Sequence, residues 1–357
     1  MPTSFELYLI DTRKSADVVA LARRGSDTAI EHLPIDSSLK KLGDMGRSIG
    51  NALTGNGNLL TAAEVKSFGG DLFNYLFRGQ LRTLYDRLPQ GSVSLQILSD
   101  RTEIKEVPWE YLLTPDRQPA PNRERTVIRV QPTCGIDSLA PKRLKNVRVL
   151  FVSADPVDQI GVDWKEIEAV MQRAFAGQMP DEVSVRVVEG ATRQGLLAAI
   201  ARTSFDVFHY FGHGDLVGGV GQLVLQDVKT GNSEFFSATD LAIALNGKGV
   251  QLAILSACLS GAGNHADDFG ILATALIRAG IPAVVANQYP IPIESISPFV
   301  GSLYSSLLAL GNIDLAVAEG RAMLAAGIPG AAAGNVEWGI PTLYRLADGQ
   351  QIFQVQS

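Results

Sequence analysis

The sequence predicts an α/β fold in which a mostly parallel β-sheet is flanked by helices, with an N-terminal α+β subdomain in front of it. From Arg148 onward, short apolar segments alternate with amphipathic ones, which is the order of elements in a parallel sheet. The segments 205–211 and 250–255 are predominantly apolar, as expected of strands buried on both faces. The chain has 357 residues, of which 46% are hydrophobic, so it can build one large domain or two ordinary ones.

Residues 1–145 are expected to form the N-terminal subdomain, in which helices and strands are mixed. The segment Gly55–Asn58 separates two stretches whose apolar residues recur at helical spacing. The predicted elements are a strand at Phe5–Ile10, helices at Ser37–Leu53 and Thr61–Leu88, strands at Val93–Leu98 and Thr126–Val130, an apolar segment at Val107–Leu113, an exposed loop at Asp116–Arg125 and a linker at Pro132–Lys145.

Residues 146–357 are expected to form the main α/β domain. Thr192 suits the start of a helix and Gly280 the end of one, while Thr230-Gly231 predicts a hairpin between two short strands. The predicted strands are Val149–Val152, Val183–Val188, Phe205–Phe211, Gln222–Gln226, Asn232–Phe236, Val250–Leu255 and Ala283–Ala286, with Thr342–Leu346 closing the sheet. The predicted helices are Asp163–Gly177, Thr192–Thr203, Ser237–Leu245, Asp268–Ala279, Ser297–Leu310 and Ile313–Ala326.

The composition excludes several classes of function. With 31 basic and 37 acidic residues, the net charge of −6 argues against a surface for nucleic acid or anionic membranes. Two cysteines cannot form a disulfide framework, so we expect a reducing, cytoplasmic compartment. The N-terminus lacks the pattern of a signal peptide, and no apolar segment reaches the roughly 18 residues of a membrane helix.

His213 and Cys258 are the candidate catalytic residues. Each follows a predicted strand, and in open α/β sheets the ligand crevice lies beyond the carboxyl ends of the strands. If the two strands are neighbours, an imidazole and a thiol share that crevice. A nearby imidazole favours the thiolate, which is the reactive form of cysteine. We therefore interpret Cys258 as a nucleophile and His213 as its base, against the alternative of a buried, inert cysteine.

Other residues at the same edge carry weaker hypotheses. Gly214 could donate its backbone N–H to an oxyanion, or it could be an ordinary turn glycine. Asp155 could line the crevice or form a turn with Pro156. His209 lies inside a strand, which predicts a hydrogen-bonded core histidine. The histidines and cysteines lack zinc spacing, and the sequence holds no dinucleotide fingerprint, phosphate loop or serine elbow, so no metal or cofactor is expected.

Several motifs resemble those of the CHAT domain, a family related to caspases, separases and gingipains. These motifs are HYFGHG at 209–214, LSACLSG at 255–261, the segment from Asp268 to Pro292, EWGIPTLYRL at 337–346 and VPWEYL at 107–112. The resemblance implies a caspase-like sheet in which the third and fourth strands are neighbours. It also implies that His213 is the catalytic base and Cys258 the nucleophile. In related metacaspases an aspartate two residues before the cysteine helps to bind a basic substrate side chain. Ser256 occupies that position here, so the resemblance does not carry a basic preference over to this chain. Ser256, and Asp155 from its place after the first strand, are candidate substrate contacts.

The resulting hypothesis is a cytoplasmic cysteine endopeptidase that cleaves protein substrates and needs no cofactor. The family resemblance further implies control by a separate regulatory protein or a signal, in a bacterial-type defence or cell-death pathway. One alternative is a catalytically silent interaction module that has kept the CHAT fold. A second alternative is an α/β protein that binds a nucleotide or another small ligand, against which the missing glycine fingerprints argue.

Overall fold

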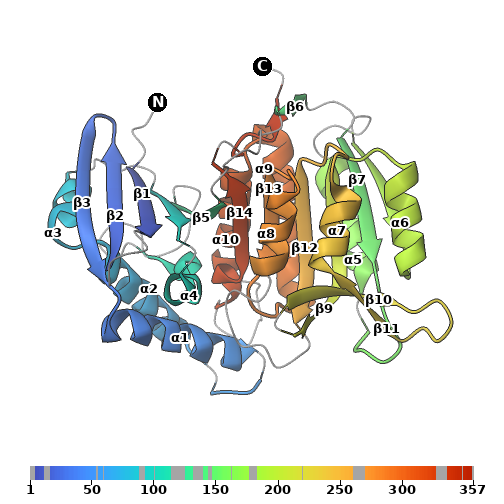
Figure 1. The fold of residues 1–357 in the computed structure, drawn as a ribbon, viewed down its shortest axis with the longest axis horizontal. Helices are drawn as coiled ribbons and strands as arrows, with labels where there is room; N and C mark the ends of the chain where they lie inside the picture. Colours follow the sequence, from blue (N-terminus) through green and yellow to red (C-terminus); the bar gives the residue numbers. More distant parts are fainter. Residues whose placement is uncertain are drawn as a thin grey trace.

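The computed structural model describes residues 5–11, 17–53, 55–58, 60–87, 93–99, 101–113, 125–131, 140–143, 147–161, 163–176, 183–218, 220–259, 270–326, 336–347 and 349–355. One mixed β-sheet runs through the molecule (Figure 1). Within the described residues it has 13 strands, ordered β11-β10-β9-β12-β13-β14-β5-β4-β1-β2-β3, and β7 and β8 join it beside β9. The strands are β1 (Phe5–Asp11), β2 (Asp17–Arg24), β3 (Asp27–Pro34), β4 (Val93–Leu98), β5 (Arg125–Gln131), β7 (Val147–Ser153), β8 (Val183–Val188), β9 (Val207–Val217), β10 (Val220–Gln226), β11 (Ser233–Ser237), β12 (Leu252–Leu259), β13 (Ala283–Asn287) and β14 (Pro341–Leu346).

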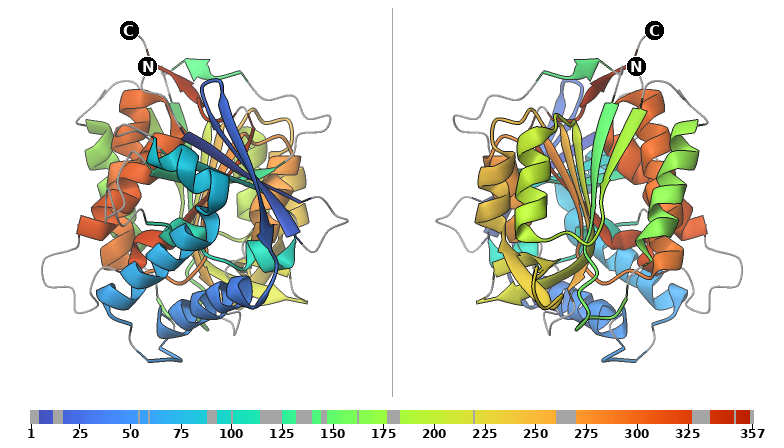
Figure 2. Two further views of the ribbon diagram at one scale, coloured as in Figure 1. Left: turned by 90° about the vertical axis from the view of Figure 1, so that its left-hand side faces the viewer. Right: turned by 90° about the vertical axis from the view of Figure 1, so that its right-hand side faces the viewer.

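Helices cover both faces of the half of the sheet around β9 and β12 (Figure 2). One face carries α5 (Trp164–Ala176), α9 (Ile293–Leu310) and α10 (Ile313–Ala326), and the other carries α6 (Arg193–Arg202), α7 (Ala238–Leu245) and α8 (Gly270–Arg278). The N-terminal half adds α1 (Ser37–Leu53), α2 (Ala62–Leu76), α3 (Gly79–Asp86) and α4 (Thr102–Lys105), and two strands, β6 (Lys142–Arg143) and β15 (Phe353–Gln354), pair apart from the main sheet. The predicted α/β sheet flanked by helices is confirmed.

The apolar character of the central strands follows from these two layers. Val207 and Phe211 of β9 enter the core beneath α5 and α9, whereas Phe208 and Tyr210 enter the core beneath α7 and α8. Because neighbouring residues of a strand point to opposite faces, a strand between two helical layers must be apolar at nearly every position. β7, β9, β12 and β13 are parallel to their neighbours in this set, so their carboxyl ends meet at one edge.

The sheet continues from the C-terminal strands into the N-terminal ones. β14 is antiparallel to β13 on one side and parallel to β5 on the other, with Leu343 opposite Ile128. The expectation that Thr342–Leu346 closes the sheet is therefore wrong, because local sequence patterns do not reveal a pairing partner more than 200 residues away. The division into domains at residues 145 and 146 stays a prediction, although the sheet is continuous across it.

In the N-terminal half, one expectation is wrong and one hairpin was not predicted. The single helix predicted at Thr61–Leu88 is in fact α2 and α3, because Arg78 is extended and Gly79 adopts a left-handed φ of 51°, so the chain turns between them. The hairpin of β2 and β3 was not predicted from the sequence. It turns at Gly25, whose φ is 58°.

A buried ion pair lies beside β5 in the N-terminal half, and a glutamine of the C-terminal half binds to it. The 3₁₀ turn Trp109–Tyr111 stands where the sequence showed an apolar segment, and it places Glu110 against Arg129 with N–O distances of 3.0 and 3.1 Å. Gln288, directly after β13, donates a further hydrogen bond of 3.0 Å to Glu110. Burial alone would raise the pKa of the Glu110 carboxyl, but the charge and hydrogen bonds of Arg129 outweigh it and the pKa lies below its ordinary value.

Candidate functional site

Cys258 and His213 lie on neighbouring parallel strands and are register partners. β12 pairs with β9 over eight residues, from Leu252 opposite Val207 to Leu259 opposite Gly214, and Cys258 stands opposite His213. Backbones of paired strands are about 4.8 Å apart, so the backbone positions of Cys258 and His213 are adjacent. The third and fourth predicted strands of the main domain are β9 and β12, and the expectation that they are neighbours is confirmed. The loop that follows Cys258, including His265, lies outside the described residues, as does Cys134.

The strand that carries His213 is longer than expected. β9 does not end at Phe211 but runs through the Gly-His-Gly sequence to Val217, so His213 lies within a paired strand. Gly212 makes this path possible, because a Cβ atom at this position would stand 2.6 Å from the Tyr210 hydroxyl and 2.9 Å from the carbonyl oxygen of Ala154. The Tyr210 hydroxyl in turn lies between two carbonyl oxygens, 2.8 Å from that of His213 and 2.6 Å from that of Val224, and its single proton is shared between them. Tyr210 and Gly212 are thus supporting residues that sequence reasoning missed.

The imidazole of His213 is buried, and one of its nitrogens has a defined partner. Nε2 lies 2.7 Å from the carbonyl oxygen of Ile160, in the loop that follows β7. A carbonyl oxygen can only accept a hydrogen bond, so Nε2 carries the proton and donates it. In the neutral ring, Nδ1 is then the free basic nitrogen. Sequence reasoning named no third member of the site, and a backbone carbonyl leaves no side-chain signal by which it could have been found.

Beneath the candidate site, His209 forms a buried polar network. Its Nε2 lies 3.1 Å from the Ser256 hydroxyl and its Nδ1 lies 3.1 Å from the Tyr304 hydroxyl of α9. Burial lowers the pKa of His209 to about 3, so the ring is neutral at physiological pH. The prediction of a hydrogen-bonded core histidine is confirmed. Ser256 is 6% exposed in this network, and its contact with a substrate side chain stays a prediction.

Gly214 and Asp155 lie at the same edge of the sheet. Gly214 is opposite Leu259 of β12 and Leu223 of β10, and its donation to an oxyanion stays a prediction. Asp155 is half-buried and follows Ser153, the last residue of β7, which is opposite Phe211 of β9. Its backbone carbonyl accepts a hydrogen bond of 2.8 Å from Gln226. The structure therefore places Asp155 near the level of His213, and its role in binding a substrate side chain stays a prediction.

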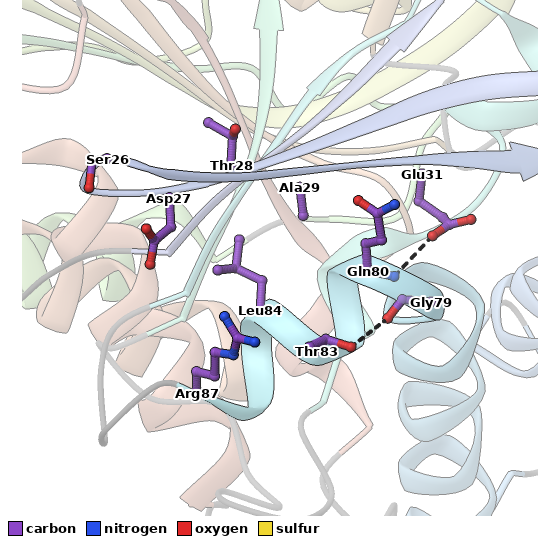
Figure 3. Close-up of a pocket in the computed structure, with 10 residues that line it drawn as sticks. All are labelled: Ser26, Asp27, Thr28, Ala29, Glu31, Gly79, Gln80, Thr83, Leu84 and Arg87. Carbon is purple, nitrogen blue, oxygen red and sulfur yellow. Dashed lines mark hydrogen bonds between the residues drawn. The ribbon is translucent and has the colours of Figure 1, made fainter.

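A separate groove of about 740 Å³ lies at the far end of the sheet, between β3 and α3 (Figure 3). Glu31 accepts a hydrogen bond from the backbone N–H of Gln80 at 3.1 Å, and the Thr83 hydroxyl donates to the carbonyl of Gly79 at 3.2 Å. Its described lining includes carboxylates and a guanidinium but neither histidine nor cysteine. The groove is thus distinct from the pair of His213 and Cys258, which lies across the sheet on β9 and β12.

Among the described residues, no helix combines the length and apolar character required to cross a membrane. Within the same part of the chain, no group of three or more histidine, cysteine or carboxylate side chains is placed to hold a metal ion.

Comparison with solved structures finds cysteine peptidases with a loosely similar arrangement. The complex of the pro- and mature domains of RgpB from Porphyromonas gingivalis is 12% identical, with a TM-score of 0.49 over 88% of this chain and 77% of that one. The Saccharomyces cerevisiae separase–securin complex is 9% identical, with a TM-score of 0.46 over 99% of this chain and 30% of that one. Caspase-1 from Spodoptera frugiperda is 13% identical, with a TM-score of 0.37 over 62% and 97%.

Comparison at the level of sequence gives a firmer result. None of the curated proteins compared with the chain matches it. The family model of the CHAT domain, however, matches residues 66–328, from α2 through the end of α10. This range includes both β9 and β12, and it crosses the expected domain boundary at residue 145. The resemblance inferred from the sequence motifs is confirmed, and the chain belongs to the CHAT domain family.

Proposed function

We propose that this chain is a cysteine endopeptidase in which Cys258 and His213 act as a catalytic dyad. The observation that carries the proposal is the register of β9 and β12, which places the two residues opposite each other. The hydrogen bond from His213 to the Ile160 carbonyl supports it, because it leaves Nδ1 as the nitrogen that can accept the thiol proton. Membership of the CHAT domain family supports the same chemistry.

The reaction follows from these groups. The Cys258 thiol transfers its proton to Nδ1 of His213, and the thiolate attacks the peptide carbonyl to form a tetrahedral oxyanion. The backbone N–H groups of Gly214 and Cys258 are the proposed donors to that oxyanion. Nδ1–H then protonates the departing amine, leaving a thioester. Water hydrolyses the thioester with Nδ1 as base, which releases the carboxylic acid and restores the thiol.

The Ile160 carbonyl has two effects in this scheme. It fixes the tautomer of His213, so the basic nitrogen is always the same one. It also accepts a charge-assisted hydrogen bond from the imidazolium that forms when the thiol is deprotonated. The activity needs no cofactor, because the nucleophile, the base and the oxyanion donors all come from the chain itself.

Substrate and control belong to the same proposal. The substrate is a protein, and Asp155 and Ser256 are the proposed contacts to the side chain before the scissile bond. A separate regulatory protein or signal switches the enzyme on, in a bacterial-type defence or cell-death pathway in the cytoplasm. The CHAT family membership supports this context.

An activity probe and a cleavage profile test the proposal together. A panel of peptidyl acyloxymethyl ketones should label Cys258 in the wild type but not in Cys258→Ala, and His213→Ala should slow labelling strongly. Proteome-wide profiling of new N-termini should show cleavages that depend on Cys258. A wild-type chain that neither reacts with any probe nor cleaves any protein would instead be the catalytically silent interaction module.

A further inference from the structure

The loop that follows β7 contacts His213 through Ile160, and the β10–β11 hairpin holds this loop in place. β7 pairs with β9 only as far as Ser153, opposite Phe211, and then leaves the sheet. β10 takes over beside the last residues of β9, from Gly214 to Val217, and β11 pairs with β10. The β10–β11 hairpin thus lies at the edge where β7 and β9 end (Figure 1). The loop of residues 154–161, which carries the Ile160 carbonyl, lies against this hairpin.

Ser233, the first residue of β11, makes the central contacts. Its backbone N–H and its hydroxyl both donate to Oδ1 of Asp158, at 2.8 and 2.9 Å. Its hydroxyl oxygen also accepts a hydrogen bond of 3.1 Å from the side-chain amide of Gln159. Gln159 directly precedes Ile160, so one serine side chain binds the two residues in front of the carbonyl that contacts His213.

Two more contacts from the same hairpin fix the beginning of the loop. The backbone N–H of Val157 donates to the carbonyl of Gly231 at 3.0 Å. The side-chain amide of Gln226, at the end of β10, donates to the carbonyl of Asp155 at 2.8 Å. The loop is therefore attached to the hairpin at residues 155, 157, 158 and 159, and the next residue is the one that contacts the imidazole.

We infer that Ser233 is a positioning residue for the catalytic histidine, an inference that rests on the proposed dyad of His213 and Cys258. Ser233 acts through Asp158 and Gln159, which hold the Ile160 carbonyl where it accepts the proton on Nε2 of His213. The contact decides which ring nitrogen is basic and stabilises the imidazolium formed in the dyad. The hairpin thereby sets the reactivity of Cys258 without touching the substrate.

Loss of the serine hydroxyl has a defined consequence. Without it, Asp158 keeps one donor and Gln159 loses its acceptor, so the loop is held less firmly at the two residues that precede the Ile160 carbonyl. The imidazole can then carry its proton on Nδ1, in which state it cannot accept the proton of the thiol. The thiolate–imidazolium pair loses a hydrogen bond and forms at higher pH. A serine that merely stabilised the fold would change the unfolding temperature but not the pH dependence of the thiol.

The rate at which iodoacetamide alkylates Cys258 over roughly pH 5 to 9 measures this directly. Mass spectrometry of the Cys258 peptide separates the signal from that of Cys134. We expect Ser233→Ala to lower the rate about tenfold at neutral pH and to raise the pH of half-maximal alkylation. Asp158→Ala, which removes the same contact from the other side, should give the same shift. Ser233→Thr keeps the hydroxyl and should restore the wild-type profile.

A matched control comes from the turn of the same hairpin. The Thr230 hydroxyl and backbone N–H both donate to Oδ1 of Asp227, at 2.9 and 2.8 Å, but Thr230 makes no described hydrogen bond to the loop. Thr230→Ala should leave the profile unchanged. If the Ser233→Ala profile coincides with the wild type while His213→Ala slows alkylation, the positioning role alone is refuted. If His213→Ala has no effect on alkylation either, the dyad itself is refuted, and the role of Ser233 with it.

Discussion

Cys258 and His213 stand opposite each other on two parallel strands that are paired over eight residues. Their backbone positions are therefore fixed by the hydrogen-bond ladder between β12 and β9 and not by a loop. His213 is 8% exposed, and its ring is oriented by the Ile160 carbonyl. A pair held in this way should tolerate loss of either side chain without loss of the fold.

Substitution of either member of the dyad should abolish proteolysis. We expect Cys258→Ala and His213→Ala each to lower the cleavage rate by about a thousandfold or more, because groups that act as a unit are nearly as costly to lose singly as together. Cleavage of a substrate found by N-terminal profiling is the measurement, and circular dichroism checks the fold. His32→Ala is the control, since that imidazole is 65% exposed on β3. Full activity of the Cys258→Ala protein would refute the mechanism.

The stability of the protein should fall in mild acid because of His209. Its pKa is lowered from 6.5 to about 3 by burial, so the folded state keeps the ring neutral while the unfolded state takes up a proton below pH 6.5. This contribution to stability is present above pH 6.5 and is lost as the pH falls towards 3, by about 1.4 kcal/mol per pH unit. Urea unfolding at several pH values measures the slope. His209→Gln should show a shallower slope over that range, and an equal slope would contradict the assignment.

The buried ion pair of Glu110 and Arg129 should be costly to break. Glu110→Ala removes the carboxylate that balances the charge of the buried Arg129 guanidinium, so we expect a loss of about 3–5 kcal/mol in the free energy of unfolding. Glu234→Ala is the matched control, because the pair it forms with Arg193 is 31% and 39% exposed and should contribute at most about 1 kcal/mol. Chemical denaturation measures both. A loss of similar size in the two variants would contradict the expected effect of burial on the cost of breaking the Glu110–Arg129 pair.

Asp155 should favour a basic side chain before the scissile bond. A half-buried carboxylate just past the end of β7 can form a charge-assisted hydrogen bond with Arg or Lys of the substrate. A fluorogenic library varied at this position should show that preference in the wild type and its loss in Asp155→Ala. A wild-type preference for Leu, Met or Asp would show that the pocket is assigned wrongly, as would an unchanged preference in the variant.

The central part of the fold, including the two strands that carry His213 and Cys258, could be predicted from the sequence because its signals are local. Strands such as β9 and β12 are apolar on both faces, and small residues mark the places where His213 and Cys258 stand. The β2–β3 hairpin was harder to predict, since its buried positions include Ala20 and Ala22, which add little to a strand pattern. The break between α2 and α3 depends on the left-handed Gly79, which lies inside an otherwise helical pattern.

The supporting contacts of the site could not be predicted from residue types at all. The partner of His213 is a backbone carbonyl, and any residue at position 160 could supply it. Ser233 resembles many strand-end serines, and only the fold brings it to Asp158 and Gln159. The same holds for Glu110 and Arg129, which are 19 residues apart and meet because a short turn places one beside the strand of the other.

The pairing of β5 with β14 bears on how the protein is made. During synthesis, residues 125–131 leave the ribosome more than 200 residues before residues 341–346, with which they pair. Until then the N-terminal half keeps an open strand edge, which is the kind of surface that aggregates with other chains. Ribosome-bound chains should therefore depend on chaperones until residues 341–346 have emerged, and a truncation before residue 341 should be insoluble even though it retains both His213 and Cys258.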